Sequence, residues 1–313
     1  MIERRRFIAG VAAVGALGAL GARPTKAQPA TSPGMPPPPI RKALKVGMIA
    51  GDGTLAEKFA IARDAGFVGV ELDAPADLDA GEVADAKAKS GLTVPGVVDS
   101  VHWSKPLNHP DASVREEGVA GLERAVRDCD AWADRQGKWG RSVLLVPALV
   151  NKDMPYAEAR TRSIEGIAKV LPLARELGVT ISIENVWNEF LLSPLEAAAY
   201  VDELNERAGA SVVGWHFDIG NIWRYGWPEQ WIDTLGARIR RLDVKGYSRA
   251  KADKEGKWAG FGVEIGDGDL DWGAVRAALT RIGYTGWAAA EVRGGDLARL
   301  TDVSERMDRV LGL

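Results

Sequence analysis

Cysteine is almost absent from this chain of 313 residues, because Cys129 is the only one. A single thiol excludes an intramolecular disulfide, a zinc site built on several cysteines and a Cys-x-x-Cys redox pair, so packing must supply the stability. The chain also lacks a basic stripe, since its 40 Lys and Arg residues are scattered and balanced by 43 Asp and Glu residues. Without a concentrated positive surface, nucleic acid is not an expected partner.

The N-terminus has the features of an export signal. Three arginines, Arg4 to Arg6, precede the apolar run AGVAAVGALGALGA and the small-residue site that ends at Ala27. Residues 1–27 are therefore predicted to be a twin-arginine signal peptide, which implies a periplasmic or otherwise exported protein. An uncleaved anchor is the alternative, but the run is shorter than the ~20 residues that a bilayer needs, so no stable membrane insertion is expected after signal removal.

A proline-rich linker, residues 28–41, is expected to lead into one folded domain, residues 42–313. In this domain, short runs rich in Val, Ile and Leu alternate with longer segments of helical periodicity, a pattern typical of βα units. The expected strands are Lys45–Ala50, Gly69–Leu72, Thr93–Val98, Ser142–Pro147, Thr180–Asn185, Val212–Asp218, Arg241–Lys245 and Gly286–Val292. The expected helices are Thr54–Ala65, Ala80–Ser90, Ala112–Arg135, Tyr156–Leu177, Pro194–Asn205, Pro228–Ala237, Trp272–Ile282 and Leu297–Val310.

Eight strand and helix pairs predict an α/β fold of the (β/α)8 TIM barrel type, whose active site lies at the carboxyl ends of the strands. A doubly wound open sheet is the alternative fold. It would usually carry a G-x-G-x-x-G turn after its first strand, and the segment Ala50-Gly51-Asp52-Gly53 does not have that spacing.

Four acidic residues end the last four expected strands: Glu184, Asp218, Asp243 and Glu291. In a barrel these strands are neighbours, so the four carboxylates are expected to converge at the mouth. Buried carboxylates need a positive partner, and hard oxygen ligands suit Mn²⁺ or Mg²⁺. The alternative for each residue is a helix cap or a pair with an arginine.

The chain resembles the xylose isomerase-like barrels, which include sugar and sugar-phosphate isomerases and epimerases. The stretches that carry the resemblance are IENVWNEFLLSP, GWHFDIGN, LDVKGYSR, IGDGDLDW and IGYTGWAAAEV. The resemblance implies a divalent metal, Mn²⁺ first, with Glu184, Asp218 and Glu291 at three of the four ligand positions. It also implies that Glu184 and Glu291 are the catalytic acid and base, acting through an enediolate.

Asp243 departs from the family pattern, because it stands where the family usually carries histidine. A fourth carboxylate favours a harder ion and makes a nearby positive charge useful. Lys245 is one candidate for that charge, and it is also a candidate to bind substrate. His216 has the same strand parity as Asp218 but is expected one layer deeper. A core histidine is the favoured interpretation, and His216 is the substitute ligand if Asp243 is not one.

By the same resemblance, Asn221 and Arg249 occupy substrate-binding positions. Phe190 lies where the family has a second glutamate, so the substrate contacts have changed. His102, after the third expected strand, and Glu71, at the end of the second, are further substrate-binding candidates.

Tryptophan is abundant, with 11 residues, and aromatic faces pack well against the apolar faces of sugars. Trp187 is the candidate for such a contact. The tryptophans at or near the predicted mouth are Trp103, Trp187, Trp215, Trp223 and Trp258.

These residues predict a metal-dependent isomerase or epimerase of a ketose-type sugar, acting on a small carbohydrate substrate. A 3-keto-glycoside lyase that uses the same site and a non-catalytic sugar-binding barrel are the alternatives, and a homo-oligomer stays open. Abasic-site endonucleases of the superfamily need several histidines for three zinc ions, and this chain has three histidines in all.

Overall fold

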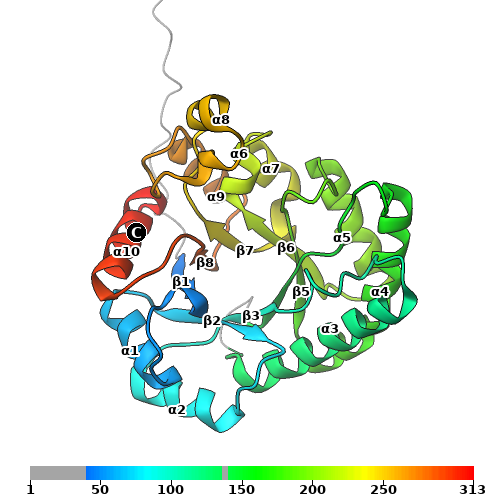
Figure 1. The fold of residues 1–313 in the computed structure, drawn as a ribbon, viewed down its shortest axis with the longest axis horizontal. Coiled ribbons are helices and arrows are strands. Elements are labelled where there is room, and N and C mark those ends of the chain that lie inside the picture. Colours follow the sequence, from blue (N-terminus) through cyan, green and yellow to red (C-terminus); the bar gives the residue numbers. More distant parts are fainter. Residues whose placement is uncertain (1–39, 136–139) are drawn as a thin grey trace, which may run out of the picture. The chain divides into compact units, whose positions relative to one another are not determined.

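A closed barrel of eight parallel strands, in the order β1 to β8, forms the centre of the fold (Figure 1). The computed structural model describes residues 40–135 and 140–313. The strands are β1 (Arg41–Lys45), β2 (Gly69–Ala74), β3 (Gly96–Asp99), β4 (Ser142–Leu145), β5 (Thr180–Glu184), β6 (Val213–Asp218), β7 (Ile239–Val244) and β8 (Trp287–Ala290). The predicted (β/α)8 barrel is confirmed.

Helices surround the strands and cover the outer face of the barrel (Figure 1). The α-helices of the described residues are α1 (Leu55–Asp64), α2 (Ala80–Ser90), α3 (Ala112–Trp132), α4 (Tyr156–Leu177), α5 (Pro194–Ala208), α6 (Ile219–Trp223), α7 (Pro228–Leu235), α8 (Arg249–Glu255), α9 (Trp272–Arg281) and α10 (Leu297–Leu311). The short helices α6 and α8, which follow β6 and β7, were not predicted. Both lie in loops that leave the carboxyl ends of their strands.

Two expected strands were placed wrongly. The first strand is Arg41–Lys45, and the apolar residues after it, Val46–Met48, form one 3₁₀ turn instead of continuing the strand. The third strand begins at Gly96, because Pro95 has no N–H to donate to a neighbouring strand and Thr93 makes only an isolated bridge to Gly69.

Local chemistry fixes where helices begin and end. Helix α1 starts with a capping box, in which the Thr54 side chain accepts from the Glu57 N–H and the Glu57 carboxylate accepts from the Thr54 N–H. Helix α4 ends at Gly178, whose φ of 62° lies in the left-handed region that glycine adopts without strain. The start of α1 closes the loop that follows the carboxyl end of β1, and the end of α4 opens the short turn into the amino end of β5.

The outer faces of the strands and the inner faces of the helices form one large apolar core. A separate small cluster, formed by Ala43, Trp287 and Ala289, lies inside the barrel. The Arg241 guanidinium lies 6.0 Å from the centre of the Trp287 ring, so charged groups begin directly beside this cluster. The interior of the barrel is therefore apolar at one level and ionic at the next.

The predicted signal peptide, residues 1–27, and residues 28–39 of the predicted linker lie outside the described residues. Within the described ranges, no helix is both long enough and apolar enough to cross a bilayer.

Gly96 gives a test of how tightly the barrel interior is packed. A Cβ at Gly96 would lie 2.4 Å from the Ser142 carbonyl oxygen on β4 and 3.4 Å from Nη2 of Arg241. We expect Gly96→Ala to lower the free energy of unfolding by about 1 to 3 kcal/mol, because strand β3 must move away from β4. Urea unfolding followed by circular dichroism measures the change.

Gly47 is the matched control, because a Cβ there has no atom within 4 Å. Gly47→Ala should leave stability unchanged or raise it by up to about 1 kcal/mol. Equal stability of Gly96→Ala and the unsubstituted protein would contradict the close approach of β3 and β4.

Candidate active site

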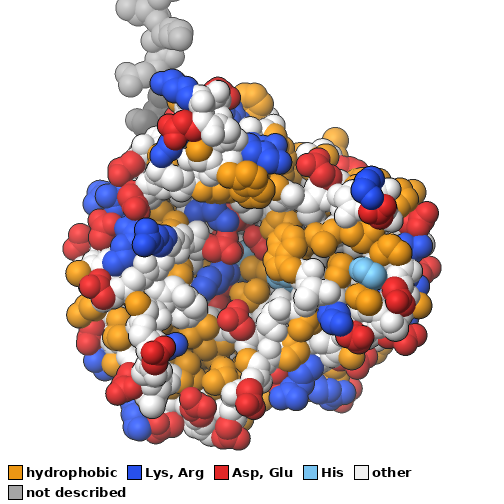
Figure 2. Space-filling view, viewed as in Figure 1, with side chains coloured by type: hydrophobic (Ala, Val, Ile, Leu, Met, Phe, Trp, Pro, Cys, Tyr) orange, Lys and Arg blue, Asp and Glu red, His pale blue; other side chains and the backbone are white. Residues whose placement is uncertain are grey.

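A pocket of about 830 Å³ opens at the carboxyl ends of the strands. Its residues come from the ends of β3, β4 and β5 and from the segments that follow β3, β5, β6, β7 and β8. Figure 2 shows acidic and basic side chains together in the central hollow of this face, with apolar side chains around them. The pocket lies where a barrel of this kind carries its active site.

The four predicted carboxylates meet at the base of this pocket. Glu184 and Asp218 are the last residues of β5 and β6, Asp243 is the penultimate residue of β7, and Glu291 follows β8 directly. Parallel pairing puts Asp218 level with Asp243, and Asp243 level with Ala289. One oxygen from each of the four carboxylates lies within 4.8 Å of the others.

Burial and mutual repulsion disfavour the charged forms of two of these acids. Burial raises the pKa of Glu184 well above its usual range, and the charges of Glu291, Asp243 and Asp218 raise it further. Burial likewise raises the pKa of Asp218 to about 7, with Glu291 and Asp243 adding to the effect. The Glu291 side chain is 38% exposed. The four carboxylates therefore form a site that favours a cation.

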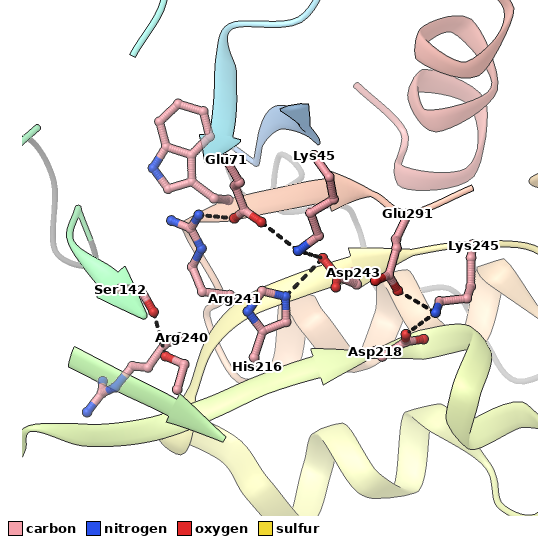
Figure 3. A network of polar contacts seen from close by, with 12 residues as sticks. Lys45, Glu71, Ser142, His216, Asp218, Arg240, Arg241, Asp243, Lys245 and Glu291 are labelled. Atoms are coloured by element: carbon pink, nitrogen blue, oxygen red, sulfur yellow. Dashed lines mark hydrogen bonds and ion pairs between the residues drawn. The ribbon is translucent and has the colours of Figure 1, made fainter. Parts of the chain in front are cut away.

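Lys245 places an ammonium between two of the acids. Its Nζ lies 2.6 Å from Oδ2 of Asp218 and also forms an ion pair with Glu291 (Figure 3). Burial alone would lower the pKa of Lys245, but Asp218, Glu291 and Glu184 raise it well above the usual value. The lysine that was predicted either to offset charge or to bind substrate thus contacts the carboxylates and lines the pocket.

Asp243 faces Lys45 and His216 on its other side. Lys45 Nζ lies 3.0 Å from Oδ1 of Asp243, and Nε2 of His216 lies 2.9 Å from the same oxygen. Lys45 also donates to Oε2 of Glu71 at 2.6 Å, and Glu71 forms an ion pair with Arg241. We call these five residues the buried charge layer; Figure 3 shows their contacts as a continuous chain across the barrel.

The buried charge layer keeps its two acids ionised. Burial would raise the pKa of Asp243, but His216 and Lys45 outweigh burial and hold the pKa below its usual range. Burial would raise the pKa of Glu71 too, and Lys45 and Arg241 instead lower it to about 2. Asp243 is therefore a carboxylate whose charge is offset before any ion approaches.

Lys45 and Arg241 were not predicted as site residues. The sequence held one signal for Arg241, because it precedes Asp243 by two residues and so faces the same side of the strand. Lys45 was assigned to the start of a strand that it in fact ends, so its position at the mouth could not be recognised.

The site residues fit a hard divalent cation. Oδ2 of Asp218 and both carboxylate oxygens of Asp243 are buried and receive no hydrogen bond of normal geometry, although ammonium or imidazole nitrogens lie within ion-pair distance of two of them. Buried carboxylate oxygens without donors are costly, and a cation with oxygen ligands satisfies them. Glu184, Asp218, Asp243 and Glu291 are the residues that would hold it, with His216 on the far side of Asp243.

Four of the predicted substrate-binding residues line the pocket: His102, Trp187, Asn221 and Lys245. Burial and the charge of Lys45 lower the pKa of His102 to about 4, so this imidazole is neutral at pH 7. The Trp187 indole donates to the Asn221 carbonyl at 3.0 Å, and the Asn221 side chain donates to the Asn185 carbonyl at 2.9 Å. These contacts fix the wall between β5 and β6.

Asn185, which directly follows Glu184, is a positioning residue that was not predicted. Its side chain donates to the Asp218 carbonyl at 2.8 Å and accepts from the Asp218 N–H at 3.1 Å and from the Trp215 indole at 3.0 Å. These bonds hold the end of β6 in place, and with it the Asp218 carboxylate.

Other expected site residues lie elsewhere. Glu71 is in the buried charge layer and does not line the pocket. Arg249 does not line it either, because its guanidinium donates to the Trp223 and Gly226 carbonyls and stacks on the Trp223 ring at 3.8 Å. Trp215 was expected at the mouth, but it is buried and packs against Trp231 of α7.

Substitution of Lys45 tests whether the buried charge layer stabilises the folded protein. Replacing it in Lys45→Met leaves Glu71 and Asp243 short of a positive partner, and we expect the free energy of unfolding to fall by about 3 to 5 kcal/mol. Adding Asp243→Asn removes one uncompensated charge, so the double variant should lose less than the sum of the two single losses. Urea unfolding curves measure all three variants.

Lys42 is the matched control on the same strand, since it pairs with Asp308 and Ser304 outside the charge layer. Lys42→Met should lose less than about 2 kcal/mol and show no coupling to Asp243→Asn. Additive losses for Lys45 and Asp243 would contradict a direct charge compensation.

The sequence of this chain matches a family model and several proteins with named activities. The family model described as "Xylose isomerase-like TIM barrel" matches residues 59–310. The L-ribulose 3-epimerase of Mesorhizobium japonicum is 28% identical over 239 residues, which cover 74% of this chain and 72% of that protein. The L-ribulose-5-phosphate 3-epimerase UlaE of Salmonella paratyphi C is 26% identical over 240 residues, which cover 72% of this chain and 76% of that protein.

Solved structures agree on the fold. A structure of L-ribulose 3-epimerase matches with a TM-score of 0.68 and 20% identity, covering 87% of this chain and 95% of the other. The 3-keto-D-glucoside 4-epimerase YcjR from E. coli matches with a TM-score of 0.68 and 15% identity, covering 88% of this chain and 100% of the other. By its matched sequence, the chain belongs to the xylose isomerase-like TIM barrel family.

Proposed function

We propose that this protein is a metal-dependent epimerase or isomerase of a ketose-type sugar. The observation that carries the proposal is the convergence of Glu184, Asp218, Asp243 and Glu291 within 4.8 Å at the base of a pocket. The names of the relatives, which act on L-ribulose or its 5-phosphate, support the same chemistry.

Glu184 and Glu291 are proposed as the two proton-transferring groups. Both line the pocket, and they reach it from β5 and from the end of β8, so they can address a bound sugar from different sides. One takes the proton from the carbon that carries the epimerised hydroxyl, and the other returns a proton to the opposite face. Burial and the neighbouring acids raise the pKa of Glu184, which suits a group that holds a proton and passes it to the substrate.

A divalent metal, Mn²⁺ first and Mg²⁺ as the alternative, would acidify that carbon by binding the neighbouring carbonyl and hydroxyl oxygens. Asp218 and Asp243 have no exposed surface, and their proposed role is to hold the ion. Asn221 and neutral His102 line the pocket and are proposed to orient sugar hydroxyls, and Lys245 to bind a substrate oxygen.

A lyase acting on 3-keto-glycosides is the second candidate. It needs the same proton abstraction, and one solved structure with this fold is named as a 3-keto-D-glucoside 4-epimerase. The proposed export by the twin-arginine route, supported by the N-terminal sequence, favours an unphosphorylated sugar in either case.

Metal binding is the first test. At a hundredfold excess over its dissociation constant, Mn²⁺ should add about 2.7 kcal/mol of stability, and such a gain should raise the melting temperature by several degrees. Asp243→Asn should weaken Mn²⁺ affinity by about tenfold or more because a ligand charge is lost. Calorimetric titration of the chelator-treated protein and its thermal melts measure both effects.

A protein whose melting temperature responds to neither chelator nor Mn²⁺ would favour the non-catalytic sugar-binding barrel. Glu206→Gln is the matched control, because Glu206 is an exposed residue near the C-terminal end of α5, which leads into the amino end of β6 and not into the carboxyl ends that carry the site. Its Mn²⁺ affinity should equal that of the unsubstituted protein.

Turnover is the second test. The Mn²⁺-loaded protein is incubated with free ketoses and with 3-keto-glycosides, and chromatography follows the epimer and the released aglycone. Glu184→Gln and Glu291→Gln should each lower kcat by about 10²-fold to 10⁴-fold or more, since each removes one proton-transferring group. Glu206→Gln should be fully active.

Epimer formation supports the leading proposal, and release of the aglycone supports the lyase. Full activity of Glu184→Gln or of Glu291→Gln would contradict the two-base mechanism. A loaded protein that converts neither class of substrate would remove both enzymatic proposals.

A further inference from the structure

Two exposed tryptophans stand at the rim of the pocket. The side chains of Trp103 and Trp258 are 54% and 64% exposed, and both line the same pocket as Glu184 and Glu291. Tryptophan is highly buried on average, so two exposed indoles at one pocket are unusual. We propose that they form a second sugar subsite, and that the substrate is a glycosylated sugar rather than a free monosaccharide. This inference rests on the proposed function.

The two indoles belong to segments that leave opposite strands of the barrel. Trp103 lies in the turn after β3, and Trp258 lies in the segment after β7, between α8 and the 3₁₀ turn Ala259–Phe261. In a closed barrel of eight strands in sequential order, β3 and β7 are four strands apart in either direction, which makes them opposite. Both tryptophans nevertheless line the same pocket, so a ligand in it can contact both indoles.

Both indoles contact neighbouring rings. Trp258 packs against Trp187 with 4.7 Å between ring centres, and Trp187 stacks on Phe261 at 4.7 Å with an angle of 29°. Trp103 makes an edge contact with His102 at 5.4 Å. Rings fixed in advance lose little freedom when a ligand binds, so a sugar face packed on them gains affinity.

The pocket also has more room than one sugar ring uses. Its volume of about 830 Å³ lies in the upper part of the ~300 to 1,000 Å³ range of small-molecule sites. The groups proposed for chemistry, Glu184, Lys245 and Glu291, serve one ring at the base. The rim above them offers indole faces together with the exposed side chain of Arg293, a hydrogen-bond donor for hydroxyls.

Sugar binding to the Mn²⁺-treated full chain tests the subsite. Isothermal titration compares maltose, cellobiose, lactose and sucrose with glucose, galactose and fructose. We expect at least one disaccharide to bind about tenfold more tightly than either of its component sugars. Trp103→Ala and Trp258→Ala should each weaken that disaccharide about threefold to tenfold, because one stacking face is lost.

The same substitutions should leave monosaccharide affinity within about twofold, and Trp258→Phe should restore part of the loss. Trp227→Ala is the matched control, since Trp227 is 50% exposed and does not line the pocket; it should change neither affinity. Circular dichroism of each variant verifies folding.

The subsite is rejected if no disaccharide in the panel binds more tightly than its components, or if the two variants weaken both sugar classes equally. The proposed function fails separately. Selective disaccharide binding without any turnover would support the subsite and contradict the proposed enzymatic activity. Epimerisation of free ketoses without disaccharide selectivity would support the activity and contradict the subsite.

Discussion

Repulsion among buried carboxylates is the constraint on which the site depends. Four acids share a region less than 5 Å wide, and three of them are buried. Such a cluster is tolerable only because ammonium groups enter it, Lys245 between Asp218 and Glu291 and Lys45 behind Asp243. The same repulsion raises the proton affinity of Glu184 and gives a divalent cation a reason to bind.

The barrel is what makes this crowding possible. Its closed sheet aligns the ends of β5 to β8, so that acids far apart in sequence meet without any loop having to fold over them. Beneath them, the buried charge layer joins β1, β2, β6 and β7 through Lys45, Glu71, His216 and Arg241. The acids at the mouth and the ion pairs in the interior are thus in contact, so a substitution in one group alters the electrostatics of the other.

The pocket separates into two levels with different chemistry. Ionised groups at the base suit proton transfer and ion binding, and the rim is largely aromatic. The segments after β5 and β7 connect the two levels, since Trp187 donates to the Asn221 carbonyl on one side and contacts Trp258 on the other. Recognition of a sugar at the rim and its positioning at the base are therefore mechanically linked.

Alternation of apolar runs with helical segments was enough to predict the eight-stranded barrel, because strand and helix periods are local properties. Position at the ends of strands was enough to single out the four acids. The first strand was misplaced, because the apolar run Val46–Met48 looks like a strand although it is a turn. Only the tertiary structure decided that Lys45, Glu71 and Arg241 are ionic partners inside the barrel and that Arg249 is held away from the pocket. Those outcomes depend on which atoms lie within a few ångströms across the barrel, and distance across a closed sheet is not encoded in spacing along the chain.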